Sequence, residues 1–189
     1  MISAILLAAG QSKRMNGENK LVKKIKDIPV IKHSVRNIMA SSIDELIVVL
    51  GHQKEIIEKL IDKNEKIKFV FNKDYESGMA SSIKTGLNNL SEKAEAFFIC
   101  LGDMPMVNAD IYNQLIKSRN QKDIIVPTYK GQPGNPVLFD KLMKEKIMNI
   151  TGDVGAKTIL ELNKDKILNI ETNDKSITKN FNTLDNFSS

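Results

Sequence analysis

The sequence is poor in the residues from which several kinds of functional site are built. It contains one Cys, two His and no Trp, and aromatic residues make up 5% of it. A single Cys cannot form a disulfide within the chain, and so few Cys and His residues cannot complete a structural zinc site. The scarcity of aromatic side chains, with no block of Lys and Arg among them, excludes the usual nucleic-acid-binding surfaces. The net charge of +5 suits a pocket for a small polyanion such as a triphosphate.

Long hydrophobic segments are also missing. No apolar run approaches the roughly 20 residues that a helix needs to cross a bilayer, and no basic segment precedes the first apolar run after Met1. We therefore expect a cytoplasmic protein that makes no contact with a membrane. Cys100 closes the apolar run 96–100, which predicts a small buried side chain and not a reactive thiol.

Short apolar runs alternate with helical patterns along most of the chain. Strands are expected at residues 2–8, 46–50, 66–72, 96–101, 124–129, 136–139 and 167–170, and helices at 29–41, 55–61, 79–90, 108–119, 140–147 and 155–162. This alternation is typical of a mostly parallel sheet covered by helices on both faces. We predict one α/β domain over residues 1–189, a three-layer sandwich with a Rossmann-like, mostly parallel sheet, because no linker or repeat divides the chain.

The first strand ends in residues that leave the backbone bare. After Ala8, Ala9 and Gly10, a flat ligand or a phosphate can approach the N–H and C=O groups. Arg14 and Lys20 follow on the same loop and offer phosphate oxygens a planar guanidinium and a mobile ammonium. The spacing of the loop matches neither a dinucleotide-binding fingerprint nor a P-loop. An ordinary turn with solvated cations is the alternative that composition leaves open.

Two other strand ends carry polar residues, and in an open α/β sheet ligands bind beyond such ends. Asp103 follows the fourth strand, where its carboxylate either binds Mg²⁺ together with phosphates and water or caps a turn. Asn72 follows the third strand. Gly78 can adopt a positive φ angle, and Ser81 or Ser82 either contacts a ligand or caps the helix that begins there.

Six segments, taken in chain order, resemble the motifs of one family. The opening loop is similar to the signature of the nucleotidyltransferases that activate sugars, isoprenoid precursors and the molybdenum cofactor. The later segments are similar to those of molybdenum cofactor cytidylyltransferases, among the MobA- and MocA-like NTP transferases. The six segments are residues 7–21, 78–87, 102–105, 131–139, 152–157 and 182–185.

The resemblance implies a fold of the nucleotide-diphospho-sugar transferase type and a specific reaction. CMP would pass from CTP to the phosphate of molybdopterin-bound molybdenum cofactor, releasing pyrophosphate and forming molybdopterin cytosine dinucleotide. Mg²⁺ is the implied cofactor, and a recipient molybdoenzyme is a further implied partner. We expect a monomer or a weak oligomer.

The roles of individual residues are carried over from the matching motifs. The implied catalytic residues are Arg14, Lys20 and Asp103. The implied nucleotide-binding residues are Leu7, Ala8, Ala9, Gly10, Arg14, Lys20, Asn72, Gly78, Ser81 and Asp103. The implied acceptor-binding residues are Gly131, Gly134, Asn135 and Pro136. The implied metal ligands are Asp103 and Asn182, and many relatives have Asp at the second position.

Departures from the family pattern leave alternatives open. Met104 stands where many cytidylyltransferases have Gln and where related guanylyltransferases often have Met, so a GTP-dependent guanylyltransferase is one alternative. Ala9 favours CTP, on the hypothesis that its methyl group fills space that a purine needs. A transferase of sugar phosphates or isoprenoid precursors is a further alternative. Such enzymes usually place Pro before the loop Lys, and the Asn19 of this chain counts against them. A non-catalytic protein that delivers a nucleotide or cofactor is the remaining alternative.

Overall fold

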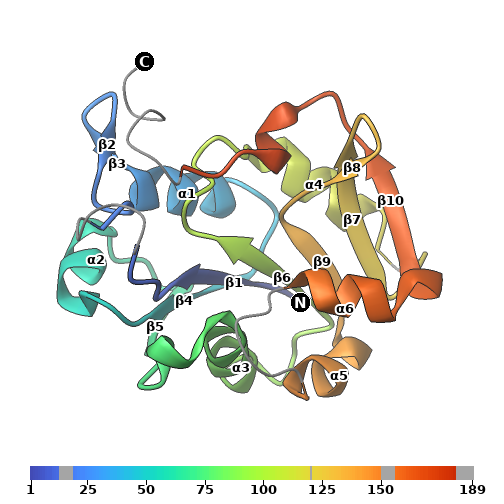
Figure 1. Ribbon diagram of the computed structural model, residues 1–189, viewed down its shortest axis with the longest axis horizontal. Helices are drawn as coiled ribbons and strands as arrows, with labels where there is room; N and C mark the ends of the chain where they lie inside the picture. Colours follow the sequence, from blue (N-terminus) through green and yellow to red (C-terminus); the bar gives the residue numbers. More distant parts are fainter. Residues whose placement is uncertain (13–18, 120, 150–155, 182–189) are drawn as a thin grey trace.

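The computed structural model describes residues 1–12, 19–119, 121–149 and 156–181. Its main sheet has eight strands, and seven of them lie in the order β10-β7-β9-β6-β1-β4-β5, with β8 paired to β7 (Figure 1). The strands are β1 Ile2–Ala8, β4 Glu45–Leu50, β5 Ile67–Phe71, β6 Ala96–Leu101, β7 Ile124–Tyr129, β8 Gln132–Pro133, β9 Val137–Asp140 and β10 Ile167–Glu171. A separate two-stranded sheet pairs β2 Lys24–Ile25 with β3 Ile28–Pro29.

Helices cover both faces of the main sheet. The α-helices are α1 Val30–Met39, α2 Lys54–Leu60, α3 Met79–Asn88, α4 Ala109–Lys117, α5 Lys144–Met148 and α6 Ala156–Leu162. Short 3₁₀ helices are η2 Tyr75–Ser77, η3 Lys141–Met143, η4 Lys164–Lys166 and η5 Lys175–Thr178. One buried cluster joins the sheet to α1, α2 and α4, and the other joins it to α3, α5 and α6. These layers confirm the predicted three-layer α/β fold.

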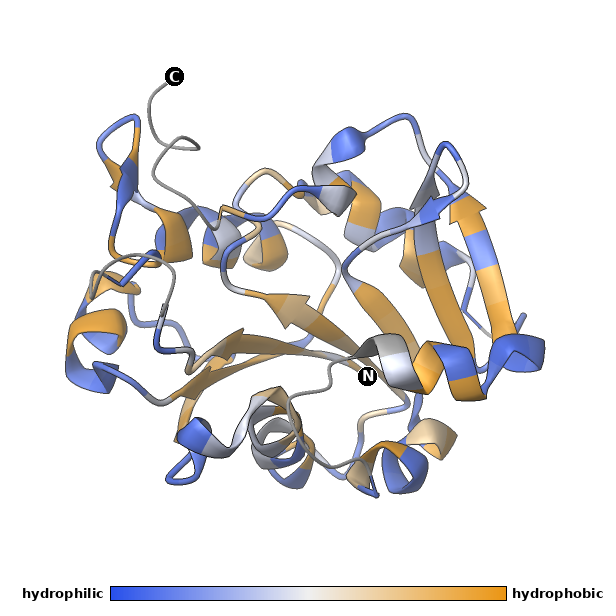
Figure 2. Ribbon diagram, in the orientation of Figure 1, coloured by the Kyte–Doolittle hydropathy of each residue, from blue (hydrophilic) through white to orange (hydrophobic). Residues whose placement is uncertain are grey.

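The continuous apolar runs form the strands at the centre of the sheet, which are buried from both sides (Figure 2). β1 runs parallel to both of its neighbours, β4 and β6. Along β6, successive side chains point to opposite faces. Phe97 stacks on Phe139 with ring centres 5.6 Å apart, whereas Phe98 meets the edge of Tyr112 on α4 at 5.3 Å. Phe97 belongs to the buried cluster that includes α3, α5 and α6, and Phe98 to the one that includes α1, α2 and α4, so β6 packs against both helical layers.

β9 runs against the direction of the sheet. It pairs antiparallel with β6 on one side and with β7 on the other. β6 and β7 therefore point the same way, and the start of β9 lies at the edge where both of them end. The sheet is mostly parallel, as predicted, and β9 carries the chain from this carboxyl edge back to the amino edge.

The structure also contains elements that the sequence patterns did not predict. The strands β2, β3 and β8 are two residues long, too short to show a period. The turn between β2 and β3 has positive φ angles at Lys26 and Asp27, without the glycine that usually marks such a turn. The helix predicted at 140–147 is a 3₁₀ turn, η3, that continues as α5, because the Asp140 carboxylate accepts a hydrogen bond from the Leu142 N–H at 2.9 Å.

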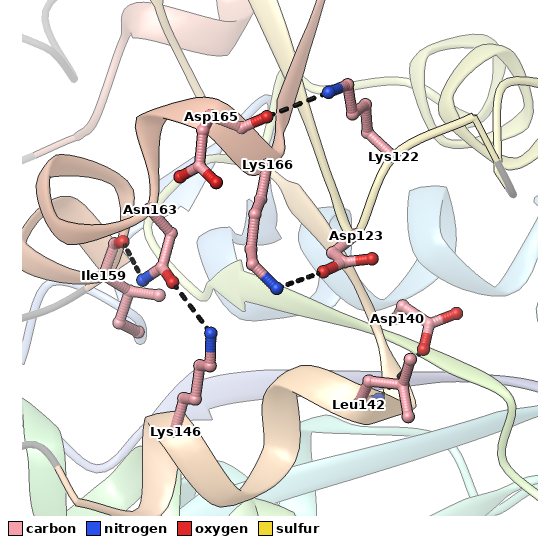
Figure 3. Close-up of polar contacts among 9 residues, drawn as sticks. All are labelled: Lys122, Asp123, Asp140, Leu142, Lys146, Ile159, Asn163, Asp165 and Lys166. Carbon is pink, nitrogen blue, oxygen red and sulfur yellow. Dashed lines mark hydrogen bonds and ion pairs between the residues drawn. The ribbon is translucent and has the colours of Figure 1, made fainter.

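Polar contacts close the amino-terminal edge of β7 and β10 (Figure 3). The Lys166 ammonium lies 2.8 Å from the Asp123 carboxylate, and the Lys122 ammonium donates to the Asp165 carbonyl at 2.9 Å. Lys146 on α5 donates to the side-chain oxygen of Asn163, just after α6, at 3.4 Å. These contacts attach α6 to the sheet at its amino edge, opposite to the carboxyl ends of the parallel strands. No described helix has the length and apolar character needed to cross a bilayer.

Substitution of Gly86 tests the contact between α3 and β1. A Cβ atom at Gly86 would lie 2.3 Å from Cγ2 of the buried Ile5. Alanine is the better helix former, but overpacking of this kind costs about 1–3 kcal/mol. We expect Gly86→Ala to lower the free energy of unfolding, measured by urea denaturation, while Asn88→Ala on the exposed side of α3 leaves it nearly unchanged. Equal stability of the two variants would contradict the tight packing.

Candidate active site

A cleft of about 560 Å³ opens at the carboxyl ends of β1 and β6, beside the start of α3. Its position agrees with the general rule for ligand sites in open α/β sheets. The residues that line it are Leu7, Ala9, Gly10, Gln11, Lys20, Leu21, Tyr75, Glu76, Ser77, Gly78, Met79, Ser82, Leu101, Asp103 and Asn180. The lining residues therefore come from four separate segments of the chain, within residues 7–21, 75–82 and 101–103 and at Asn180.

The floor of the cleft is the bare end of β1. An ideal Cβ placed on Gly10 would have no heavy atom within 4 Å, so this backbone faces open space. On the other side, Gly51 allows close approach, because a Cβ there would lie 2.7 Å from both the Cβ and the carbonyl oxygen of Ala9 and 2.7 Å from the Cβ of Tyr75. The His52 N–H donates to the Ala9 carbonyl at 3.2 Å. The glycines thus let two strand ends and η2 meet around one hollow.

Lys20 and Asp103 come together in the cleft although they are 83 positions apart. The Lys20 ammonium lies 2.5 Å from the Asp103 carboxylate, whose side chain is only 9% exposed. Each loop is also fixed through its backbone. The Lys20 N–H donates to Ser12 Oγ at 3.1 Å, and the Gly102 N–H donates to the Leu7 carbonyl at 3.1 Å. The cation and the carboxylate are therefore presented together by two strand ends.

The amino-terminal end of α3 forms one wall of the cleft. Gly78 is the N-cap residue, with a φ angle of 109°, and has no side chain with which to cap the helix. The N–H groups at the start of a helix and the helix dipole favour an anion at this end. Asn72 is buried behind it and donates to Ser81 Oγ at 2.8 Å and to Ser82 Oγ at 3.0 Å. The two serines are thus held by Asn72, and neither of them is the N-cap.

The predicted nucleotide-binding residues divide into those that line the cleft and those that do not. Leu7, Ala9, Gly10, Lys20, Gly78 and Asp103 line it. Asn72 and Ser81 belong to the hydrogen-bonded support of α3, and Ala8 packs in the core on the face that α1 covers. Arg14 and Asn182 lie outside the described residues. The roles of all these residues stay predictions.

Several cleft residues have no counterpart among those predicted. Gln11 and Glu76 face each other across the opening, with the Gln11 side-chain amide donating to the Glu76 carboxylate at 2.9 Å. Asn180 reaches the cleft from the end of the described chain, where the Phe181 N–H donates to the Asp103 carbonyl at 2.8 Å. Gln11 lies within the opening motif and could have been found there. Glu76 and Asn180 belong to no periodic pattern, since only the tertiary fold brings them to the cleft.

The predicted acceptor-binding residues lie outside the cleft, on the segment between β7 and β9. Gly131 is exposed at the tip of the β7–β8 turn, with a φ angle of 75°. Gly134 is buried, and a Cβ there would lie 2.5 Å from the Ile177 carbonyl oxygen. The Asn135 N–H donates to the same carbonyl at 2.8 Å, and buried Pro136 precedes β9. Because β9 starts where β6 ends, this segment lies at the same sheet edge as Asp103.

Two other sequence expectations concern metals and the single thiol. No group of three or more His, Cys, Asp or Glu residues that could hold a metal ion occurs among the described residues. Asp103 is therefore a single carboxylate, whose metal would need further ligands from a substrate or from water. Burial raises the pKa of the Cys100 thiol to about 12. This confirms that Cys100 is a buried side chain, because a thiol with so high a pKa is a poor nucleophile at neutral pH.

A model of the MobA-like NTP transferase domain matches residues 4–168. The chain belongs to this family. The match runs from β1 into β10 and includes every residue that lines the cleft except Asn180. The resemblance found in the sequence motifs is thereby confirmed, and the protein is a member of a nucleotidyltransferase family.

Two curated proteins are similar to this chain over most of its length. The molybdenum cofactor cytidylyltransferase of Escherichia coli K12 is 27% identical over 186 residues, which cover 94% of either chain. The bifunctional protein GlmU of Thermosipho africanus is 30% identical over 167 residues, which cover 86% of this chain and 36% of GlmU. This chain spans about a third of the length of the GlmU proteins that it matches.

A solved structure has the same fold over nearly the whole chain. Rv0371c of Mycobacterium tuberculosis H37Rv superposes with a TM-score of 0.87 at 22% identity, covering 98% of this chain and 95% of that one. Its complex with manganese superposes with a TM-score of 0.83 at 19% identity and the same coverage. This similarity shows that the two proteins share one fold.

Substitution of Asn72 tests the support of the cleft wall. Asn72→Ala removes three side-chain hydrogen bonds from a buried position, those to Ser81, to Ser82 and from the Asp74 N–H, and leaves the hydroxyl of buried Ser82 without this donor. Lost buried hydrogen bonds cost about 1–3 kcal/mol, so we expect a drop of that size in the free energy of unfolding by urea denaturation. Lys73→Ala at the exposed neighbour is the control. An unchanged midpoint for Asn72→Ala would show that α3 does not depend on this contact.

Proposed function

We propose that this protein transfers CMP from CTP to the phosphate of molybdopterin-bound molybdenum cofactor, releasing pyrophosphate and forming molybdopterin cytosine dinucleotide. The observation that carries the proposal is the pairing of Lys20 with Asp103 in a cleft between the bare end of β1 and the start of α3. The similarity to the E. coli cytidylyltransferase over nearly the full length of both chains supports the choice of acceptor.

The cleft has the parts that a triphosphate needs. Gly10 leaves room for the nucleotide against the strand end, and the start of α3 favours negative charge. Lys20 supplies a mobile ammonium that can exchange the Asp103 carboxylate for phosphate oxygens. We infer that Arg14, on the same loop, adds a second cation. The two cations would neutralise the triphosphate while the strand end and helix hold it in place.

Asp103 is suited to hold Mg²⁺. Mg²⁺ in proteins is commonly bound through one or two carboxylates, with phosphate oxygens and water completing its shell. A single, nearly buried carboxylate that already attracts a cation meets this requirement. Asn182 would add a neutral oxygen ligand. When bound, the ion would neutralise charge on the reacting phosphates.

The reaction requires no nucleophile from the protein. An oxygen of the acceptor phosphate attacks the α-phosphorus of CTP, a new P–O bond forms, and the bond to the bridging oxygen breaks as pyrophosphate leaves. Positioning in line and stabilisation of charge are enough for such a step. We infer that Gly131, Gly134, Asn135 and Pro136 form the acceptor side. Gly134 would act there through packing, because its surface is covered by Ile177.

The proposal assigns the choice of base to Ala9. Ala9 lines the cleft, and we infer that its methyl group limits the room that is left for the base. A pyrimidine needs less room at this position than a purine. CTP is therefore the expected donor.

Pyrophosphate release tests the function directly. The purified protein, incubated with Mg²⁺ and molybdopterin cofactor, should release pyrophosphate fastest with CTP when CTP, GTP, ATP and UTP are compared. A clear preference for GTP would replace the cytidylyltransferase by a guanylyltransferase. Release only with a sugar phosphate or methylerythritol phosphate as acceptor would exclude the molybdenum cofactor as the substrate.

Substitution of Asp103 tests the proposed metal ligand. Asp103→Asn keeps the size of the side chain and removes its charge, so we expect turnover to fall by about 100-fold or more, as when one transition-state contact is lost. Thermal unfolding should show that the variant is folded. Asp110→Asn on exposed α4 removes the same charge away from the cleft and should keep full activity. Wild-type turnover in Asp103→Asn would remove Asp103 from the site.

A further inference from the structure

The turn between β7 and β8 is held by a carboxylate from another strand. The turn residues Lys130 and Gly131 have φ angles of 51° and 75°, as the central residues of a type I′ hairpin require. Their N–H groups point to Glu171, the last residue of the edge strand β10. Glu171 Oε1 accepts the Lys130 N–H at 2.7 Å, and Glu171 Oε2 accepts the Thr128 hydroxyl at 2.6 Å. Successive N–H groups of such a turn form a concave site for an anion.

Glu171 is ionised in this arrangement. The Thr128 hydroxyl, followed by the backbone N–H groups of Lys130 and Gly131, lowers the pKa of the Glu171 carboxyl below its ordinary value. Hydrogen bonds to a charged acceptor are stronger than those between neutral groups. The carboxylate therefore fixes the backbone of the turn more firmly than the two-residue strand β8 can by itself.

The turn lies at the sheet edge that carries the cleft. β7 points the same way as β6 and is two places from it in the sheet, a distance of about 10 Å at the usual strand spacing. An acceptor that reached the α-phosphate of a nucleotide in the cleft would extend over this interval. Gly131 at the tip is one of the residues that the sequence motifs assign to the acceptor.

A chain of backbone contacts connects the turn to Asp103. The Gly134 N–H donates to the Pro127 carbonyl at 2.8 Å, and the Asn135 N–H donates to the Ile177 carbonyl. Ile177 belongs to η5, and the chain then continues to Phe181, whose N–H donates to the Asp103 carbonyl. The position of the turn is thereby fixed relative to the cleft.

We propose that Glu171 is a positioning residue for the acceptor: it holds the β7–β8 turn in the conformation that receives the acceptor beside the cleft. The proposal rests on the proposed function, because it assumes an acceptor that binds at this edge. Glu171 does not contact the nucleotide site, so its loss affects the acceptor and leaves CTP binding unchanged.

Glu171→Gln tests this role, because glutamine keeps the length of the side chain but loses the charge and one acceptor oxygen. We expect the KM for molybdopterin cofactor to rise about tenfold, the effect of one lost charge-assisted hydrogen bond, with the KM for CTP and the kcat at saturating acceptor changed less than twofold. Hydrogen exchange followed by NMR should become faster at the amides of Lys130 and Gly131. Glu65→Gln removes the same charge at an exposed site beyond the other end of the sheet and should change none of these quantities.

The outcomes separate this proposal from the one on which it rests. An unchanged acceptor KM, or equal rises in both KM values, would overturn the positioning role while the cytidylyltransferase activity stood. Unchanged exchange at Lys130 and Gly131 would show that the carboxylate does not hold the turn. If the wild-type protein released no pyrophosphate with the cofactor, the proposed function would fail, and the acceptor role of Glu171 with it.

Discussion

The pairing of Lys20 with Asp103 is the contact on which the arrangement of the cleft depends. It joins the loop after β1 to the turn after β6. The Lys20 N–H also donates to Ser12 Oγ within its own loop, and the Gly102 N–H donates to the Leu7 carbonyl of β1. A nearly buried carboxylate needs a compensating cation, because an unpaired buried charge is costly. The Lys20 ammonium meets that need. Under the proposed function, a metal ion and phosphates would take over both partners. The same electrostatic requirement thus explains the stability of the cleft and its proposed chemistry.

The sheet makes this pairing possible because it brings strand ends together. β1 lies between β4 and β6 and is parallel to both, so three loops open at one edge. Small residues then decide how near these loops come. Gly51 lets Ala9 and Tyr75 approach, and Gly86 lets α3 lie directly on Ile5 of β1. A larger side chain at Gly86 would push α3 away from β1, and one at Gly51 would push the end of β4 away from Ala9 and Tyr75.

Much of this arrangement could be predicted from the sequence, and the limits have physical reasons. The strand at 96–101 and the strand at 2–8 were predicted with the observed bounds, because continuous apolar runs of that length fit only buried positions. Leu7, Gly10, Lys20 and Asp103 were predicted for the site from local motifs and line the cleft. Gln11 with Glu76, and Thr128 with Glu171, are contacts between distant segments. No local sequence pattern encodes these contacts. The Gln11–Glu76 hydrogen bond and the Glu171 carboxylate at the β7–β8 turn could therefore be found only from the three-dimensional structure.

The central claim is that the cleft holds a nucleoside triphosphate and a divalent metal between Lys20 and Asp103. A crystal structure with Mn²⁺ and a CTP analogue that cannot be cleaved between the α- and β-phosphates tests it most directly, because manganese is located by its anomalous scattering. The account predicts one manganese peak in contact with the Asp103 carboxylate, the triphosphate on the Lys20 ammonium and the cytosine against Ala9 and Gly10. Manganese bound away from Asp103, or a nucleotide bound outside the cleft, would contradict it.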